Sequence, residues 1–266
     1  MSKIEEAIYE IHHMDNMANS NRFLNKIHPL VKLLITVLYI IMLTSINKYD
    51  LIKTLSMSIF LIVVSIVGDL SIWHAVKKLK FILLLLFFIG ITNPILDRNI
   101  YIYLGNLPIY TGVISMITLF LKGCFAIISS YFFIATTSIE GVCYALKLIH
   151  IPNVIVTVIM LIYRYMIVFL KELQRIWTAY SMRAPKQKGF NIKSWGSMIG
   201  SLMIKSIDKA QVVYESMEMR GFNPDTCFVK EQQISTVSYM MLLLGEMLIL
   251  GIYFIPIFEI VGSIFI

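Results

Sequence analysis

Five long apolar runs alternate with polar segments along the chain, at about residues 30–46, 54–67, 80–95, 110–136 and 235–257. A helix needs roughly 20 residues to cross a hydrocarbon core of about 30 Å, so each run is a candidate membrane span. The second run is the weakest, because Ser56, Ser58 and Ser65 interrupt it. The runs are continuous rather than alternating, which disfavours a β-barrel. We therefore predict an all-α fold, a polytopic membrane helical bundle of about five transmembrane helices with long cytoplasmic helices.

The same pattern divides the chain into four segments. Residues 1–29 form an N-terminal cytoplasmic or interfacial segment, residues 30–136 transmembrane helices 1–4, residues 137–234 a cytoplasmic region, and residues 235–266 a C-terminal transmembrane helix. In the first segment, Ile4, Ala7, Ile8 and Ile11 follow helical spacing, which predicts a short amphipathic helix on the membrane surface. Its acidic residues and missing apolar core run exclude an ordinary cleaved signal peptide.

The region 137–234 is too long to be a simple connector and lacks the alternation typical of strands, so it is predicted to be helical. A first helix begins at Pro152 and ends at Arg183, before Ala184 and Pro185, with a break expected near residues 169–172. A second helix is expected to be capped by Ser194 and to end at Gly221. Its apolar stripe comprises Trp195, Met198, Ile199, Leu202, Ala210, Val213 and Met217.

Composition supports an integral membrane protein. Of 266 residues, 58% are hydrophobic and only 15% are charged, and the mean hydropathy is +0.78. The net charge of +7 comes from basic blocks between the apolar runs, which favours membrane orientation over nucleic-acid binding. Five spans and the positive-inside rule predict a cytoplasmic N-terminus, a cytoplasmic region 137–234 and an external C-terminus.

Both cytoplasmic helices are predicted to end in a methionine, an arginine and a small residue. These triplets are Met182-Arg183-Ala184 and Met219-Arg220-Gly221. An arginine at a helix C-terminus can simply interact with the helix dipole, which contributes about 0.3–1 kcal/mol. The repeated triplet favours a second interpretation: an adaptable apolar side chain, a planar five-donor fork and a small residue form a plug for a pocket in another protein.

With these triplets, the sequence resembles the CbiQ/EcfT family, the transmembrane T component of energy-coupling factor (ECF) transporters. The family signature is two short x-Arg-x motifs at the ends of cytoplasmic coupling helices. The likeness extends over about residues 14–223 and takes in "NRFLNKIHPLVKLL", "IATTSIEGVCYALKLIHIP", "LIYRY" and "SIDKAQVVYESMEMRGF". It is greatest to the cobalt-uptake CbiQ type, although Ala184 stands where glycine is frequent.

The resemblance implies a non-catalytic scaffold that links two cytoplasmic ABC-type ATPases to a membrane substrate-capture (S) subunit, for uptake of cobalt ion, or alternatively of a vitamin or nickel. It implies a multi-pass protein of the bacterial cytoplasmic membrane, and assigns ATPase binding to Met182, Arg183, Ala184, Met219, Arg220 and Gly221. The chain has no G-x-x-x-x-G-K-[ST] phosphate loop, so we expect no cofactor on this chain, with ATP and magnesium on the partner ATPases.

Two ionisable residues, Lys122 and Glu246, fall near the middles of predicted spans. Such residues usually face a bundle interior or a partner. A mutual ion pair, snorkelling or polar contacts within the complex, and an ion path all remain open.

Other chemistry finds less support in the sequence. No metal site is expected at His12, His13, His28, His74 or His150, because no ligand set surrounds them at metal spacing. A membrane-embedded lipid-modifying enzyme, the rival from another class, would require clustered aspartates, a His/Glu metal set or a serine with a base. A secondary transporter would favour inverted repeats, and the two halves of the chain differ.

Overall fold

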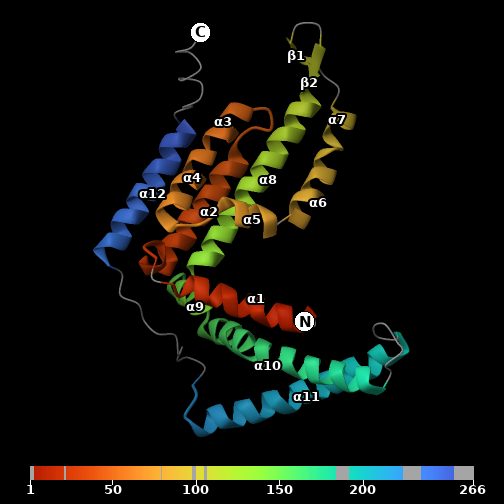
Figure 1. Cartoon of the computed structure of the whole chain (residues 1–266). Helices are drawn as coiled ribbons and strands as arrows, with labels where there is room; N and C mark the ends of the chain where they lie inside the picture. The colour runs from red at the N-terminus through yellow and green to blue at the C-terminus, as the bar shows by residue number, and fades with distance from the viewer. Residues whose placement is uncertain are drawn as a thin grey trace. The chain divides into compact units, whose positions relative to one another are not determined.

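The computed structural model describes residues 3–20, 22–78, 80–97, 100–104, 107–183, 192–223 and 235–254 (Figure 1). The shorter helices are α3 (Leu51–Ser56), α5 (Ile72–Lys78), α7 (Asn93–Leu96), α9 (Ile139–Leu148) and a 3-10 turn, η1 (Leu24–Lys26). The longer helices are α1 (Lys3–Ala18), α2 (Pro29–Ser45), α4 (Ser58–Gly68), α6 (Lys80–Gly90), α8 (Thr111–Thr136), α10 (Asn153–Arg183), α11 (Ile192–Met219) and α12 (Thr236–Phe254). The predicted all-helical membrane fold is confirmed.

A short β-hairpin is the one departure from helical structure in the described residues. Strands β1 (Ile100–Leu104) and β2 (Leu107–Tyr110) pair antiparallel, with Leu104 opposite Leu107 and Ile100 opposite Tyr110. This stretch lies between the third and fourth predicted spans. Its alternating isoleucine and tyrosine residues are the signal for a strand that was missed.

The chain packs as two compact units. Residues 16–141 and 232–266 form the bundle unit, and residues 1–15 and 142–231 form the long-helix unit. The first joins segments far apart in the sequence, because α12 packs against α2.

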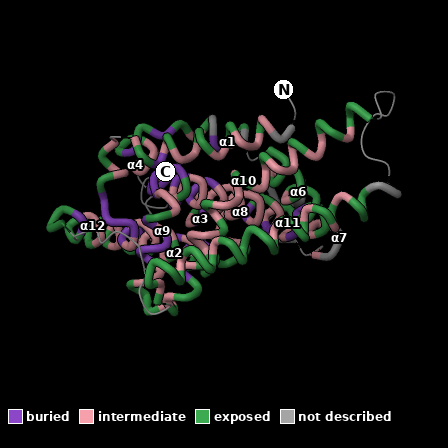
Figure 2. Tube along the Cα trace, turned by 90° about the horizontal axis from the view of Figure 1, so that it is seen from below, coloured by how far each residue is buried: buried purple, intermediate pink, exposed green. Residues whose placement is uncertain are grey.

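The core of the bundle unit lies between α2, α8 and α12, with α3 and α4 alongside. Tyr39 and Leu43 of α2 are completely buried, as is Ile249 of α12. Figure 2 colours the buried stretches of the tube purple. On the outward faces, many large apolar side chains stay exposed, as expected where lipid takes the place of water.

The weak second span is bent rather than absent. Helix α3 ends at Ser56 and α4 begins at Ser58, so Met57 lies at the joint. The Tyr39 hydroxyl donates a hydrogen bond to the Met57 carbonyl at 3.2 Å, and the Tyr39 ring stacks on Phe60 with centroids 4.7 Å apart. A buried tyrosine thus satisfies a backbone group at the bend, which a membrane interior requires.

Four helical segments are long and apolar enough to cross a membrane: α3–α4 together, α8, α10 and α12. Three of these match predicted spans. The predicted first and third spans correspond to α2, with 17 residues, and α6, with 11 residues, and both are shorter than the roughly 20 residues of a typical span.

Helix α10 is unbroken, so the break predicted near residues 169–172 is wrong. The helix runs for 31 residues from Asn153 to Arg183 without proline or glycine. Nothing in its sequence removes a hydrogen bond donor or releases the backbone, which are the usual causes of a kink. A single rod therefore joins its apolar first half to its polar second half.

Helix α1 lies antiparallel along α10 in the long-helix unit. Its Asp15 accepts a hydrogen bond from the Tyr163 hydroxyl, and its Glu5 accepts one from the Gln174 amide at 2.8 Å. The two contacts are ten residues apart on α1 and eleven on α10. The two helices therefore advance by nearly the same length between the contacts, as two antiparallel neighbours do. The predicted amphipathic helix is thus present, with Ile8 and Ile11 half-buried.

The predicted N-cap of α11, Ser194, is wrong. The helix begins at Ile192, so Ser194 lies within the first turn rather than before it. The preceding Asn191 belongs to residues 184–191, which lie outside the described part of the chain.

Candidate coupling site

Helix α11 ends in a backbone motif that presents Arg220. Gly221 has a left-handed conformation, with φ of 76°. Its N–H donates to the Glu218 carbonyl at 2.9 Å, and the N–H of Phe222 donates to the Met217 carbonyl at 3.0 Å. This pair of hydrogen bonds is a Schellman motif, which glycine favours because it has no Cβ. The predicted stop at Gly221 is confirmed, and the backbone itself satisfies the last carbonyls.

Helix α10 ends at Arg183, as predicted from the proline that follows two residues later. Ala184, the third residue of this triplet, lies outside the described residues. Met182 and Arg183 occupy the last turn of the helix and are exposed. The two arginines thus occupy the same position, the end of a long helix.

The methionine and arginine side chains of both triplets are exposed. Met182 is 76% exposed and Met219 is 84% exposed, and both arginines are exposed. Within the described part of the chain, neither guanidinium forms a hydrogen bond or ion pair. Two exposed methionines beside two unpaired arginine forks form a surface that is suited to a protein partner.

The two arginines lie at opposite ends of the pair formed by α10 and α11. Figure 1 shows the two helices running in opposite directions. Glu172 of α10 joins them by an ion pair with Lys205 of α11, at 2.5 Å, and also pairs with Arg175 at 3.4 Å. With 1.5 Å of rise per residue, Arg183 and Arg220 are roughly 40 Å apart along the helix pair. One small pocket cannot hold both, so the geometry suits two separate docking positions.

Most of the apolar side chains of helix α11 are exposed. None of its residues is fully buried among those whose burial is described, as the tube in Figure 2 shows. Of the predicted stripe, Met198, Leu202, Val213 and Met217 are half-buried, whereas Trp195, Ile199 and Ala210 are exposed. Further exposed apolar residues are Met203, Ile204, Ile207, Val212 and Tyr214. An exposed apolar surface of this kind on a polar helix marks an interaction site.

The chain matches a known family of membrane proteins over most of its length. The family model of the CbiQ cobalt transport protein matches residues 20–232, which is most of the chain and includes both arginine triplets. The chain belongs to the CbiQ cobalt transport protein family. It is therefore a multi-pass membrane component of a transport system.

Two curated relatives agree with this assignment over part of their lengths. An uncharacterised protein of Methanocaldococcus jannaschii, MJ1571, is 26% identical over 143 residues, covering 52% of this chain and 49% of the relative. A protein of Methanocorpusculum labreanum named as a fused cobalt transport protein, CbiMQ, is 30% identical over 128 residues, covering 47% of this chain and 21% of the relative. The chain thus spans about half of the first relative and about a fifth of the second.

In this CbiQ-family protein, Lys122 contacts backbone carbonyls rather than Glu246, the partner that the ion-pair hypothesis gave it. The Lys122 ammonium of α8 donates to the carbonyl of Ile46 and lies 3.5 Å from the carbonyl of Thr44, both at the C-terminal end of α2. No ion pair joins it to Glu246 in the described residues, where Glu246 is half-exposed on α12. The last carbonyls of a helix have no partners within the helix, so they attract a nearby ammonium.

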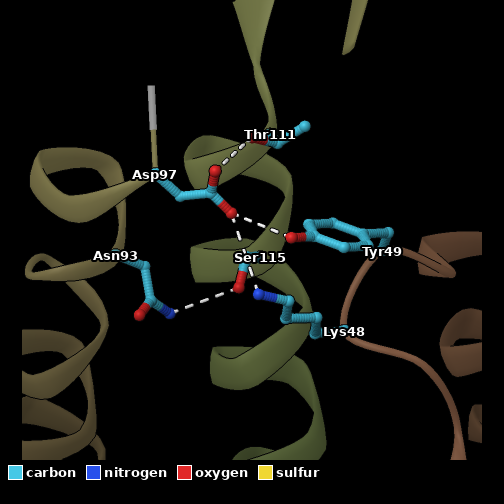
Figure 3. A network of polar contacts seen from close by, with 6 residues as sticks. All are labelled: Lys48, Tyr49, Asn93, Asp97, Thr111 and Ser115. Atoms are coloured by element: carbon cyan, nitrogen blue, oxygen red, sulfur yellow. Dashed lines mark hydrogen bonds and ion pairs between the residues drawn. The ribbon is translucent and has the colours of Figure 1, made fainter. Parts of the chain in front are cut away.

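A second polar cluster surrounds Asp97, where α7 and α8 meet the end of α2 (Figure 3). Its carboxylate accepts hydrogen bonds from Tyr49 at 2.8 Å and from Thr111 at 3.0 Å, and Lys48 lies 3.8 Å away. Nearby, the Asn93 amide donates to Ser115 at 3.4 Å. The neighbouring Tyr49 and Asp97 raise the pKa of Lys48 above its ordinary value. The sequence gives no local signal for this cluster, because its residues come together only through helix packing.

The described residues contain no group of three or more His, Cys, Asp or Glu side chains placed to hold a metal ion. His12 and His13 are exposed on α1, and His28 is buried at the start of α2, where its ring accepts a hydrogen bond from the Leu30 N–H at 3.2 Å. This ring therefore caps a helix.

Proposed function

We propose that this protein is the transmembrane coupling subunit of an ATP-driven ECF importer. Met182-Arg183-Ala184 and Met219-Arg220-Gly221 each dock into a groove on one of two ABC-type ATPases, and the bundle unit contacts a membrane substrate-capture subunit. Movement that follows ATP binding and hydrolysis on the partners passes through α10 and α11. The chain itself carries out no catalysis and holds no ATP or magnesium.

One observation carries this proposal: two exposed methionine-arginine helix ends at opposite ends of one helix pair. A largely exposed methionine beside the arginine contributes nothing to helix capping. The Schellman motif already satisfies the carbonyls at the end of α11, so Arg220 is free for a partner. The contact between α10 and α11, which includes the ion pair of Glu172 with Lys205, would let a displacement at one arginine move the other.

Cobalt ion is the substrate that the family favours, and the related CbiMQ protein is named for cobalt transport. In such importers, a separate capture subunit would hold the ion. Nickel or a vitamin is the alternative cargo.

Purification of the intact protein in a mild detergent tests the proposal. Two copies of a nucleotide-binding subunit, or one copy of each of two, should co-purify together with a small membrane protein. A preparation that transports substrate with no ATPase present would contradict the proposal.

The proposed orientation has the N-terminus and the helix pair in the cytoplasm, as the distribution of basic residues predicts. In a variant without cysteines, a single cysteine at Lys209 should resist a membrane-impermeant reagent in intact cells, whereas one at Asn47 should react. Both positions are exposed, so access decides the result. Labelling at position 209 together with protection at position 47 would show that the orientation is opposite to the proposed one.

A further inference from the structure

The bundle unit contains an apolar cavity that joins a polar one. The apolar cavity, about 530 Å³, lies between α2, α4, α8 and α12, and its walls include Phe60, Val63, Phe132, Met241 and Leu248. The polar cavity, about 220 Å³, is lined by Ser20, Asn25, Lys26, Thr137 and Ser138 among others. Lys32 and Thr136 line both cavities, which therefore meet at these two residues.

The charged side chains that line the two cavities are all positive. No aspartate or glutamate lines either of them, whereas Lys32 lines both and Lys26 lines the polar one. The Lys32 ammonium donates to the carbonyls of Thr136 at 2.7 Å and Asn25 at 3.4 Å. An ammonium has three donors, so one remains for a ligand. No carboxylate within the described residues neutralises this charge, which favours an anionic ligand.

Two buried polar atoms beside this lysine lack partners. Among the described residues, the Thr137 hydroxyl and the Asn25 side-chain carbonyl oxygen are buried and form no hydrogen bond. The Asn25 amide nitrogen donates to the carbonyls of Met17 and Ala18, which fixes its oxygen as the free atom. Buried polar groups are nearly always satisfied, so a hydrogen-bonding ligand or water belongs here.

We propose that the joined cavities bind one anionic phospholipid whose head group carries hydroxyls. One acyl chain occupies the apolar cavity, the phosphate meets Lys32 and Thr137 with Lys26 nearby, and a head-group hydroxyl donates to Asn25. Phosphatidylglycerol has this chemistry. An apolar chamber with a basic, hydroxyl-lined mouth fits an amphiphile better than a free anion, which has nothing to fill the chamber. Basic pockets between transmembrane helices recognise anionic head groups in this way.

The test uses the full-length protein in nanodiscs, followed by native mass spectrometry and thermal unfolding. Phosphatidylglycerol and phosphatidylcholine with identical acyl chains are the probes, and inorganic phosphate is the third arm. Both lipids carry a phosphate, but the quaternary ammonium of phosphatidylcholine cancels its charge, and that head group has no hydroxyl to donate to Asn25. The wild-type protein should therefore retain phosphatidylglycerol about tenfold better, which corresponds to about 1.4 kcal/mol. The same lipid should raise the unfolding temperature, and inorganic phosphate should not.

Matched variants separate the two parts of the site. Lys32→Gln should remove the preference for phosphatidylglycerol, whereas Lys77→Gln, at an exposed lysine outside both cavities, should keep it. Val63→Phe should fill the apolar chamber and weaken retention of both lipids, whereas Ile62→Phe, on the exposed face of the same helix, should not. If Lys32→Gln fails to fold, Thr137→Val serves, since it keeps the shape and removes the hydroxyl.

Several results would overturn the site. These are an undiminished lipid preference in both Lys32→Gln and Thr137→Val, full retention in Val63→Phe, stabilisation by inorganic phosphate equal to that by lipid, or a wild-type protein that retains no lipid because water fills the cavities. A partner protein helix recovered in place of lipid would also overturn it.

Discussion

Replacing both Arg183 and Arg220 with alanine should abolish ATPase association and coupled uptake while leaving the protein folded in the membrane. Both side chains are exposed and form no ion pair in the described part of this chain, so their loss removes nothing from its own packing. In the complex, each would be a buried, charge-assisted contact, and truncating one partner of such a contact costs about 2–5 kcal/mol. Simple capping would contribute no more than about 1 kcal/mol.

Single variants and lysine replacements refine this expectation. Arg220→Ala and Arg183→Ala should each weaken one ATPase contact, so each should reduce uptake more mildly than the double variant. Lysine should rescue only in part, because an ammonium keeps the charge and loses the planar fork. Lys209→Ala is a matched control, since Lys209 is exposed on the same helix. Near-normal co-purification, ATP hydrolysis and uptake in the double alanine variant would reduce the triplets to helix caps.

Gly112→Ala should strongly destabilise the bundle unit. A Cβ at Gly112 would lie 2.6 Å from the Asp97 carbonyl oxygen, 2.7 Å from that of Asn93 and 2.7 Å from the Cα of Pro94. All three are backbone atoms, so α7 would have to move away from α8. Overpacking usually costs about 1–3 kcal/mol, and the upper end is expected here because no flexible side chain can give way. The move would also break the hydrogen bond from the Gly112 N–H to Asp97.

Thermal unfolding in detergent measures this effect against Gly200→Ala. Nothing lies within 4 Å of a Cβ at Gly200, and alanine is the better helix former by about 1 kcal/mol. The two alanine variants should therefore shift the unfolding temperature in opposite directions. Equal shifts would show that α7 does not contact α8 as closely as described.

Local signals made the helix ends predictable. A proline two residues beyond Arg183 and a glycine directly after Arg220 act within one turn of the chain. The positions of both triplets at the ends of long helices followed from these signals, although Ala184 lies outside the described residues. The all-helical class likewise followed from the continuous apolar runs.

Contacts between side chains from distant segments of the chain could not be predicted in the same way. The hypothesis that Lys122 pairs with Glu246 rested only on the position of each residue near the middle of a predicted span. In the structure, Lys122 instead contacts a carbonyl at the end of α2. The Asp97 cluster depends on how three segments pack, and the joined cavities need four helices to form their walls. The unbroken course of α10 could have been predicted locally, because the helix contains no proline or glycine to interrupt it.

Photo-crosslinking from the two exposed methionines tests the coupling role most directly. A photoreactive amino acid at position 182 or at position 219, in cells that contain the complete transporter, should capture an ABC-type ATPase in each case. The same amino acid at Ile162, exposed in the apolar half of α10, should not. If neither position 182 nor position 219 captures an ATPase while the transporter is active, the helix ends are not the coupling site.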